Sequence, residues 1–240
     1  MAVYDRYPDV MSGHGPWVQR AEQKRQQRIL RMVERSLISC DAVQALEVGV
    51  GIGLFARACK ERNWAYVGVD RNQKMVDRIG EEFRILCAEI PPWPEQLDQS
   101  AFDLAYSAFV LEHLADGSAA FDFVDVLKRA VKPGGVVALV VPDALSLGLE
   151  FWNLDYTHRY PTAERNVTQI LQEHDLNVDH VVRYRGPGWT GVAYWFLRVL
   201  GWFYSYRFFG FLSRRPSLCY SIYQYVNQDV LVFICRKSNS

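Results

Sequence analysis

The sequence has no paired-cysteine motif, no internal repeat and no low-complexity tract, and these absences exclude several classes of protein. Its five cysteines are odd in number, scattered and never spaced as C-x-x-C, which argues against a disulfide framework and against a metal held by cysteines. We therefore expect a reducing, cytoplasmic compartment and no bound metal. The first residues, from Met1 to Arg6, also lack the charged and then apolar pattern of a secretion signal.

The chain also lacks net charge, because 27 basic residues balance 27 acidic residues. The two signs are unevenly spread: ten acids and one base lie between residues 81 and 125, whereas eight bases and one acid occur from residue 183 onward. This pattern suggests different partners for the two regions, with a charge asymmetry of no functional meaning as the alternative. With 50% hydrophobic residues, the 240-residue chain can form one α/β domain with appendages and a substantial core.

The stretch from Ala45 to Gly53 carries the most specific signal in the chain. It reads A-L-E-V-G-V-G-I-G, an apolar strand that ends in an acid and three alternating glycines, and a helical pattern follows. A strand, a glycine turn and a helix N-terminus allow the backbone to approach a nucleotide-like ligand. Counting from Gly49, the last glycine of the dinucleotide-binding motif G-x-G-x-x-G would fall on Leu54. That motif is therefore absent, which argues against an NAD(P) oxidoreductase.

The remaining pattern, Glu47-x-Gly49-x-Gly51-x-Gly53, resembles motif I of the class I S-adenosylmethionine-dependent methyltransferases. Two later segments are similar to further motifs of this family. The segment F-D-L-A-Y-S-A-F-V-L-E-H-L at residues 102–114 resembles the family's F-D…E-H segment after the fourth strand, and K-P-G-G at residues 132–135 resembles its L-K-P-G-G turn. The three matches occur in the family's order and spacing over residues 45–142.

Hydrophobic periodicity predicts alternating strands and helices, which is typical of a parallel, doubly wound sheet. Strands are expected at residues 43–48, 65–70, 83–87, 102–107, 136–141, 178–184 and 229–236, and helices at 17–38, 54–62, 73–79, 119–130 and 162–174. The helix at 17–38 is basic, and we expect it to lie across the sheet edge. The resemblance implies a Rossmann-like α/β fold whose seven-stranded, mostly parallel sheet has the order 3-2-1-4-5-7-6, with helices on both faces.

We expect a single methyltransferase domain over residues 1–240. It divides into an N-terminal helical cap (1–40), a core (41–186), an aromatic-rich insertion between the last two strands (187–227), and the last strand and tail (228–240).

The resemblance implies S-adenosyl-L-methionine as the cofactor, a ligand with a sulfonium, an α-ammonium and a carboxylate. Glu47 would meet the cationic ligand directly or through water, while N–H groups of Gly49, Gly51 and Gly53 receive its carboxylate. Asp70 ends the second strand, where a carboxylate can accept hydrogen bonds from both ribose hydroxyls. A cap on the following helix is the alternative role for Asp70.

The remaining expected cofactor contacts concern the adenine and the methionine portion. Arg71 and Met75 would lie near the adenine face. The third strand ends in Cys87-Ala88-Glu89, and the family's usual acid falls on Cys87, which leaves the adenine contact to the backbone near Ala88 or to Glu89. Ser107 would lie near the methionine portion.

Methyl transfer needs alignment of the reactants, worth about 7–11 kcal/mol in favourable cases, and a hydroxyl nucleophile also needs a base. Two histidines are candidates for catalysis. His113 follows the fourth strand at the carboxyl edge of the sheet, where open α/β sheets bind ligands, and His158 lies in the crossover after the fifth strand. A positioning role at the helix start is the alternative for His113. We expect O-methylation of a small or lipid-linked acceptor, such as an envelope glycan, a lipid or a quinone-like molecule.

The aromatic insertion does not decide whether the chain contacts a membrane or another protein surface. The segment from Val192 to Leu212 is long enough to span a membrane. Two features oppose a crossing: the charges of Arg198 and Arg207, and the need for the chain to return strand seven to the same sheet. A peripheral contact with the inner face of a membrane is one interpretation. A lid on the sheet edge or a homodimer interface is the other, so the chain is a monomer or a homodimer.

Two other interpretations concern the partner and the activity. Nucleic acid is not expected, because the basic residues lie among large apolar side chains. The alternative function is a catalytically silent domain that binds S-adenosylmethionine and regulates a membrane-bound partner.

Overall fold

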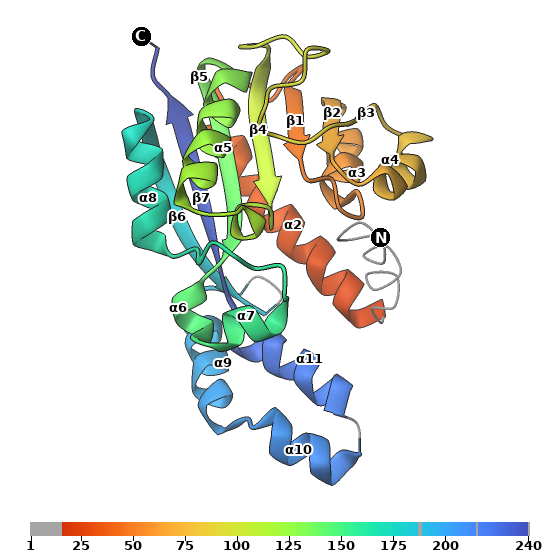
Figure 1. Cartoon of the computed structure of the whole chain (residues 1–240), viewed down its shortest axis with the longest axis vertical. Coiled ribbons are helices and arrows are strands. Elements are labelled where there is room, and N and C mark those ends of the chain that lie inside the picture. Colours follow the sequence, from red (N-terminus) through yellow and green to blue (C-terminus); the bar gives the residue numbers. More distant parts are fainter. Residues whose placement is uncertain (1–15, 187–188, 215, 240) are drawn as a thin grey trace.

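The computed structural model describes residues 16–186, 189–214 and 216–239, and their strands form one seven-stranded sheet (Figure 1). The strands follow the order β3-β2-β1-β4-β5-β7-β6, with β7 antiparallel to both neighbours and the other pairs parallel. The Rossmann-like fold and the strand order implied by the resemblance are confirmed. The strands are β1 (Gln44–Val48), β2 (Ala65–Asp70), β3 (Ile85–Cys87), β4 (Phe102–Ala108), β5 (Val131–Pro142), β6 (Leu176–Arg185) and β7 (Asp229–Lys237).

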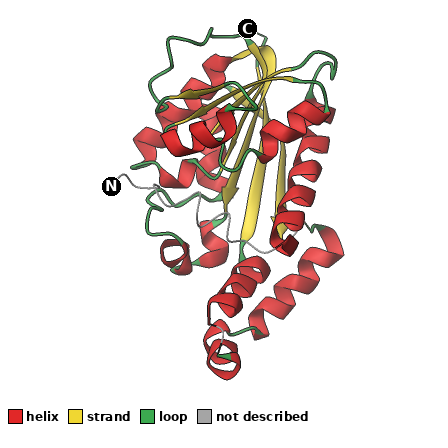
Figure 2. Cartoon of the chain, turned by 90° about the vertical axis from the view of Figure 1, so that its right-hand side faces the viewer, coloured by secondary structure: helices red, strands yellow, loops and turns green. Residues whose placement is uncertain are grey.

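Helices cover both faces of the sheet (Figure 2). On one face, α2 (Pro16–Ser36) and α3 (Leu54–Glu61) bury apolar side chains against β1, β4, β5 and β7. On the other face, α5 (Gly117–Ala130) and α8 (Glu164–Glu173) pack into a second core with Leu46, Leu139 and Phe233. α4 (Gln73–Gly80) packs against β2 and β3. Three short helices follow the carboxyl ends of β4 and β5: η1 (Leu111–His113), α6 (Ala144–Leu147) and α7 (Glu150–Leu154).

The position expected for the basic N-terminal helix was wrong. α2 lies on a face of the sheet and not across its edge, because its stripe of Ile29, Leu30 and Val33 is fully buried against side chains that include Val136 and Ile234. Its basic residues occupy the remaining sides, where Arg28, Arg31 and Arg35 are exposed. The rest of the predicted cap, residues 1–15, lies outside the described part of the chain.

The K-P-G-G segment forms a tight turn near the start of β5, because a Cβ on Gly135 would lie 2.9 Å from the Lys132 carbonyl oxygen and 3.0 Å from the Val131 Cβ. β5 begins at Val131, and its pairing with β4 shifts register so that Phe102 pairs with Val131 while Leu104 pairs with Val136. The extra residues form a bulge in which Gly134 has a φ of 74°, a left-handed conformation that a glycine adopts without strain. Pro133 and the left-handed Gly134 are the central residues of this turn, so the turn that the sequence implied is confirmed, and pairing with β4 resumes at Val136.

The aromatic insertion folds into three helices below the sheet in Figure 1. These are α9 (Gly191–Phe203), α10 (Tyr206–Ser213) and α11 (Pro216–Asn227). α10 packs on α11, and α9 and α11 contact β6. In the described part of the chain, no helix has both the length and the apolar character that crossing a membrane requires.

Asp229, the first residue of β7, joins the insertion to the sheet. Its side chain is fully buried, and Oδ1 accepts a hydrogen bond from Arg185 Nε at 2.5 Å while Oδ2 accepts one from the Tyr194 hydroxyl at 2.8 Å. Arg198 of α9 lies 3.6 Å from the same Oδ2. One carboxylate therefore holds the end of β6 and the first turns of α9 together.

We expect Asp229→Asn to lower the free energy of unfolding by about 3–5 kcal/mol, because it leaves the Arg185 guanidinium buried without its counter-charge. Urea denaturation followed by circular dichroism measures this loss. Asp179→Asn is the matched control, since Asp179 pairs with Arg236 at a partly exposed site, 3.2 Å apart, and such pairs contribute about 1 kcal/mol or less. Equal losses in both variants would contradict the anchoring role of Asp229.

Candidate active site

The turn after β1 depends on glycine. Gly49, Gly51 and Gly53 have φ angles of 83°, 53° and 74°, all in the left-handed region that side chains disfavour. At Gly49 space is also limiting, because an added Cβ would overlap Cγ2 of Val110. The turn brings its backbone against the segment after β4 and then starts α3, with the Gly53 N–H bonded to the Val50 carbonyl at 3.0 Å.

Asp70 links this glycine turn to the turn after β2. Oδ2 accepts a hydrogen bond from the Val50 N–H at 2.9 Å, and Oδ1 accepts one from the Asn72 N–H at 2.8 Å. Burial raises the pKa of the Asp70 carboxyl, and these backbone donors oppose the rise. The N-cap of α4 is Asn72, whose side chain accepts a bond from the Lys74 N–H. Asp70 thus organises both turns and is not the residue that caps the next helix.

Glu47 is a buried carboxyl at the end of β1. Only 3% of the residue is exposed, and its Oε2 accepts a hydrogen bond from the Tyr66 hydroxyl at 2.6 Å. Burial raises the pKa of the Glu47 carboxyl well above its ordinary value, the Tyr66 hydroxyl opposes the rise, and the negative charge of Asp70 adds to it. A carboxyl held in this way gains by ionising when a cation enters the cavity beside it.

These groups open onto a cavity of about 350 Å³ at the carboxyl edge of the sheet, within the range of small-molecule sites. Nine of the residues predicted for the site line it, and four do not. The lining residues are Glu47, Gly49, Gly51, Asp70, Arg71, Met75, Ala88, Glu89 and His113. The four that lie outside the wall are Gly53, Cys87, Ser107 and His158.

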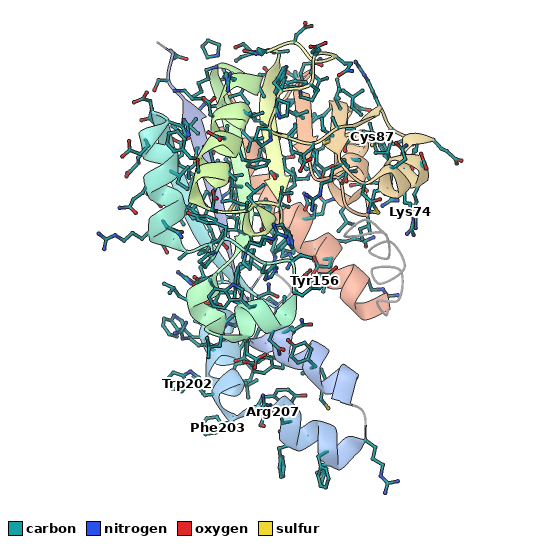
Figure 3. The ribbon with its side chains drawn as sticks, in the orientation of Figure 1. Lys74, Cys87, Tyr156, Trp202, Phe203 and Arg207 are labelled. Carbon is teal, nitrogen blue, oxygen red and sulfur yellow. The ribbon has the colours of Figure 1, made fainter. Side chains whose placement is uncertain are left out.

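The structure gives several of these residues other contacts. Cys87 is exposed at the end of β3, with its Sγ 3.9 Å from the Arg71 carbonyl (Figure 3). The Ser107 hydroxyl is buried and donates to the Val48 carbonyl at 3.0 Å, so it ties β4 to β1. Gly53 is the N-cap of α3. Ala88, which does line the cavity, donates its backbone N–H to the Asp70 carbonyl at 3.0 Å.

Sequence reasoning missed the contribution of α2. Glu22, Arg25, Gln26 and Ile29 recur at helical spacing and line the cavity from the face opposite the glycine turn. Gln26 is buried, and its side-chain oxygen accepts a hydrogen bond from the Tyr106 hydroxyl at 2.9 Å. The recurrence of these residues at helical spacing was the one sequence signal that could have indicated this contribution. Nothing in the sequence indicates which side of α2 meets the cavity.

Glu112, His113 and His158 come together at one end of the cavity, and we call them the histidine–glutamate cluster. Their ligand-capable atoms all lie within 4.8 Å of one another. The backbone carbonyl of Glu112 accepts N–H groups of Arg159 at 2.8 Å and Tyr160 at 3.1 Å, which holds the loop that carries His158 against η1. The His113 and His158 rings lie 5.0 Å apart.

Hydrogen bonds fix the tautomers of both rings. The Thr157 hydroxyl donates its proton to the Asp155 carboxylate at 2.6 Å, so it accepts from His113 Nδ1 at 2.9 Å. His158 Nδ1 lies 2.7 Å from the Phe151 carbonyl, which can only accept. Each ring therefore carries its proton on Nδ1 and a lone pair on Nε2.

Burial shifts the three pKa values of the cluster toward the neutral forms. It raises the pKa of Glu112 to about 8. Burial, reinforced by the nearby His158, lowers the pKa of His113 to about 4, and burial also lowers the pKa of His158. Both rings are consequently neutral near pH 7, where an unprotonated Nε2 is available as an acceptor or a ligand.

Comparison with known proteins identifies the class to which this fold and cavity belong. A family model described as a methyltransferase domain matches residues 9–181, well over half of the chain. The chain therefore belongs to the class I S-adenosylmethionine-dependent methyltransferases, as the sequence motifs implied. A comparison with curated protein sequences gives no match.

Solved structures share the fold at low sequence identity. A SAM-dependent methyltransferase from Archaeoglobus fulgidus is 17% identical with a TM-score of 0.61, over 88% of this chain and 92% of that one. The N-methyltransferase NodS from Bradyrhizobium japonicum, in complex with S-adenosyl-L-homocysteine, is 18% identical with a TM-score of 0.59, over 90% and 87%. The [4+2]-cyclase SpnF is 15% identical with a TM-score of 0.60, over 89% and 81%.

We expect Gly49→Ala to weaken the binding of S-adenosylhomocysteine by at least about 10-fold. The new methyl group must displace Val110 or the turn, and a left-handed alanine alone costs about 1–2 kcal/mol. Isothermal titration calorimetry measures the affinity. Gly191→Ala is the matched control, because Gly191 has a φ of 60° with no atom near its missing Cβ. Unchanged affinity in Gly49→Ala would show that the turn does not form the binding wall.

Proposed function

We propose that this methyltransferase transfers a methyl group from S-adenosylmethionine to a hydroxyl oxygen of a small or lipid-linked acceptor. The observation that carries the proposal is the cavity in which two carboxyl groups, the buried Glu47 and the partly buried Asp70, meet a glycine turn at the carboxyl edge of the sheet. Such a site can receive a cationic nucleoside, with backbone N–H groups for its carboxylate.

Each end of the cofactor has a matching group in this proposal. Asp70 accepts the ribose hydroxyls with the lone pairs that remain on its two oxygens, while Glu47 provides the negative charge for the α-ammonium or the sulfonium. Gly49 and Gly51 line the wall beside them, and Met75 and Ala88 supply apolar and backbone contacts for the adenine. Arg71 and Glu89 form an exposed ion pair, 3.5 Å apart, at the rim of that subsite.

The acceptor enters at the end of the cavity that His113 lines. His158 lies behind His113, and both Nε2 atoms carry lone pairs that can act on an acceptor hydroxyl. A neutral polar group at this point suits a nucleophile that must lose a proton before or during methyl transfer. We therefore propose His113 and His158 as the residues that act on the acceptor, with oxygen rather than nitrogen as the methylated atom.

The aromatic insertion supports a lipid-linked acceptor at the inner face of a membrane. Residues 189–227 contain four arginines and no acid, and several of their large apolar side chains are highly exposed. Trp202, Phe203 and Arg207 lie at the end of the molecule farthest from the C-terminus (Figure 3). Exposed tryptophan and phenylalanine beside arginine favour the boundary of an anionic bilayer. The exposed apolar side chains are Val192, Trp195, Phe196, Val199, Leu200, Trp202, Phe203, Phe208, Phe209, Phe211 and Leu212.

A lid over the cavity has less support than the membrane interpretation. Among the described residues, those that line the cavity belong to the segment from Glu22 to Val140, which lies before the insertion in the chain. Asn153 of α7 donates to the Tyr220 hydroxyl of α11 at 3.4 Å, so the insertion adjoins the loop that carries His158 rather than the cofactor end. A dimer through the same apolar face is an outcome that the membrane experiment distinguishes.

A second candidate function is a catalytically silent domain that binds S-adenosylmethionine and regulates a membrane-bound partner. The observation that favours it is the exposure of Cys87, at the position where the family usually has an acid near the adenine. The [4+2]-cyclase SpnF has a similar fold, so this fold also supports chemistry other than methyl transfer.

We expect the full chain to bind S-adenosylmethionine and to transfer its isotope-labelled methyl group to a component of an envelope-lipid extract. Calorimetry measures the binding, and phase partition with mass spectrometry identifies the labelled product and the methylated atom. Asp70→Asn should weaken binding by at least about 10-fold, since it removes the negative charge that accepts hydrogen bonds from the backbone of both turns and, in this proposal, from the ribose hydroxyls. Asp77→Asn, an exposed carboxylate on α4, is the control that should leave binding unchanged.

The outcomes separate the candidates. Tight binding with no labelled product from any extract would favour the silent domain, and binding of a nicotinamide nucleotide in place of S-adenosylmethionine would reject both.

We expect the chain to sediment with vesicles that contain anionic phospholipid, and to do so less with zwitterionic vesicles. The double variant W202S/F203S should reduce the bound fraction several-fold, because burying these two side chains contributes about 1.5–3 kcal/mol each. Ile38→Ser is the matched control, since Ile38 is 82% exposed on the body of the protein. Equal sedimentation of wild type and double variant would contradict the membrane contact, and a dimer lost only in the double variant would assign the face to self-association.

A further inference from the structure

The histidine–glutamate cluster contains a buried polar atom that the protein itself does not satisfy. Oε2 of Glu112 is buried and has no hydrogen-bond partner among the described residues. The side chain is 1% exposed. An unsatisfied buried carboxylate oxygen costs free energy, and an unoccupied ion site is one of the recognised explanations for such an atom.

A shared proton does not account for the cluster. A hydrogen bond between Glu112 and His113 would need a separation near 3 Å, whereas Oε1 of Glu112 lies 4.0 Å from His113 Nε2. The gap between these atoms is too long for a hydrogen bond and suits a small ion between them.

We propose that Glu112, His113 and His158 bind a divalent transition-metal ion at the acceptor end of the cavity. The donor set is two imidazole nitrogens and one carboxylate oxygen, which zinc and non-haem iron sites use with further positions left open. Ligand atoms bonded to one ion at about 2.0–2.2 Å lie at most about 4.4 Å apart. The observed spread of up to 4.8 Å slightly exceeds this limit, so a bound ion would have to draw the ligand atoms together.

The surroundings of the cluster provide the outer contacts that a metal site needs. Imidazole ligands of a metal usually donate their other N–H to a carboxylate or a backbone carbonyl, which orients the ring and fixes the ligating nitrogen. His158 makes such a contact with the Phe151 carbonyl at 2.7 Å. His113 donates a hydrogen bond to the Thr157 hydroxyl, which in turn donates one to the Asp155 carboxylate. Both Nε2 atoms are thereby set as ligands before an ion arrives.

The cation gives the acceptor oxygen a place to bind. His113 lines the cavity, so a position left open on the ion would face the acceptor. An acceptor hydroxyl that coordinates the ion loses its proton to solvent water more readily. The resulting oxygen forms a bond to the methyl carbon while the carbon–sulfur bond breaks and its electron pair stays on sulfur. The lone pairs that a general base would use are then engaged by the ion. This role rests on the methyl transfer proposed above, whereas the cation site itself does not.

The test titrates the full chain, free of any polyhistidine tag and stripped of metal by a chelator, with Co²⁺ alone. Visible absorption and calorimetry report the binding, and neither depends on enzyme activity. We expect one Co²⁺ per chain, and we expect Glu112→Gln and His158→Gln each to weaken binding by at least about 10-fold. His174→Gln is the matched control, because His174 and His158 are both 7% exposed and both bond a backbone carbonyl.

Three results would overturn the cation site. They are an absence of Co²⁺ binding, unchanged binding in Glu112→Gln and His158→Gln, and an equal loss in His174→Gln. A measurement on the wild-type chain covers the case in which a variant fails to fold: Co²⁺ should broaden the ring NMR signals of His113 and His158 and leave those of His174 and His180 sharp. Broadening confined to the other histidines would also reject the site.

The same samples keep this inference separate from the proposed function. Binding of S-adenosylmethionine without binding of Co²⁺ would reject the cation site alone. Binding of Co²⁺ at the cluster by a chain that does not bind S-adenosylmethionine would reject the methyl-transfer proposal alone.

Discussion

The glycine turn between β1 and α3 is held by one side chain, Asp70, and the rest of the cavity is arranged around that contact. The bond from the Val50 N–H to Asp70 crosses from the turn after β1 to the end of β2. It fixes the height of the turn above the sheet, and Gly49 then allows the segment after β4 to approach. Because that segment leads into η1, the position of Glu112 and His113 follows from the same contact.

Sequence reasoning predicted the parts of the site that lie at strand ends, in the turns that connect a strand to the next helix. The glycines, Glu47 and Asp70 are such parts, because an alternating pattern fixes which strand end they occupy and parallel strands bring those ends to one edge. The strand order came from the family resemblance. The contribution of Glu22 and Arg25 could not be predicted, because the rotation of α2 depends on how its apolar stripe packs into the core on that face of the sheet. Residues 155–160 posed the same difficulty, since long-range hydrogen bonds, from Arg159 and Tyr160 to the Glu112 carbonyl and between Thr157 and His113, bring His158 to His113.

Burial divides the carboxyls of the protein into two kinds. Asp229 is buried with its counter-charges beside it, so its negative charge stabilises the fold. Glu47 and Glu112 are buried without a full counter-charge, and burial is the main cause of the raised pKa of each. A fold tolerates the free-energy cost of a buried carboxyl without a counter-charge where a bound ligand stabilises that carboxyl, which is why such groups concentrate at functional sites. In the proposals made above, each of these two carboxyls faces a positive charge that a bound ligand supplies: S-adenosylmethionine at Glu47 and a metal ion at Glu112.

The position of the insertion follows from the direction of the last two strands. β7 runs antiparallel to β5, and Val230 pairs with Pro142, so the chain between β6 and β7 must emerge at the carboxyl edge of the parallel strands. The cavity opens at that same edge. α6, α7 and the loop with His158 lie between the two, and the contact of Asn153 with Tyr220 joins that loop region to α11. Under the proposed function, an acceptor bound against α9 and α10 would meet the His158 side of the cluster before it meets the cofactor. That order suits a transferase whose acceptor arrives from a surface while its cofactor arrives from solution.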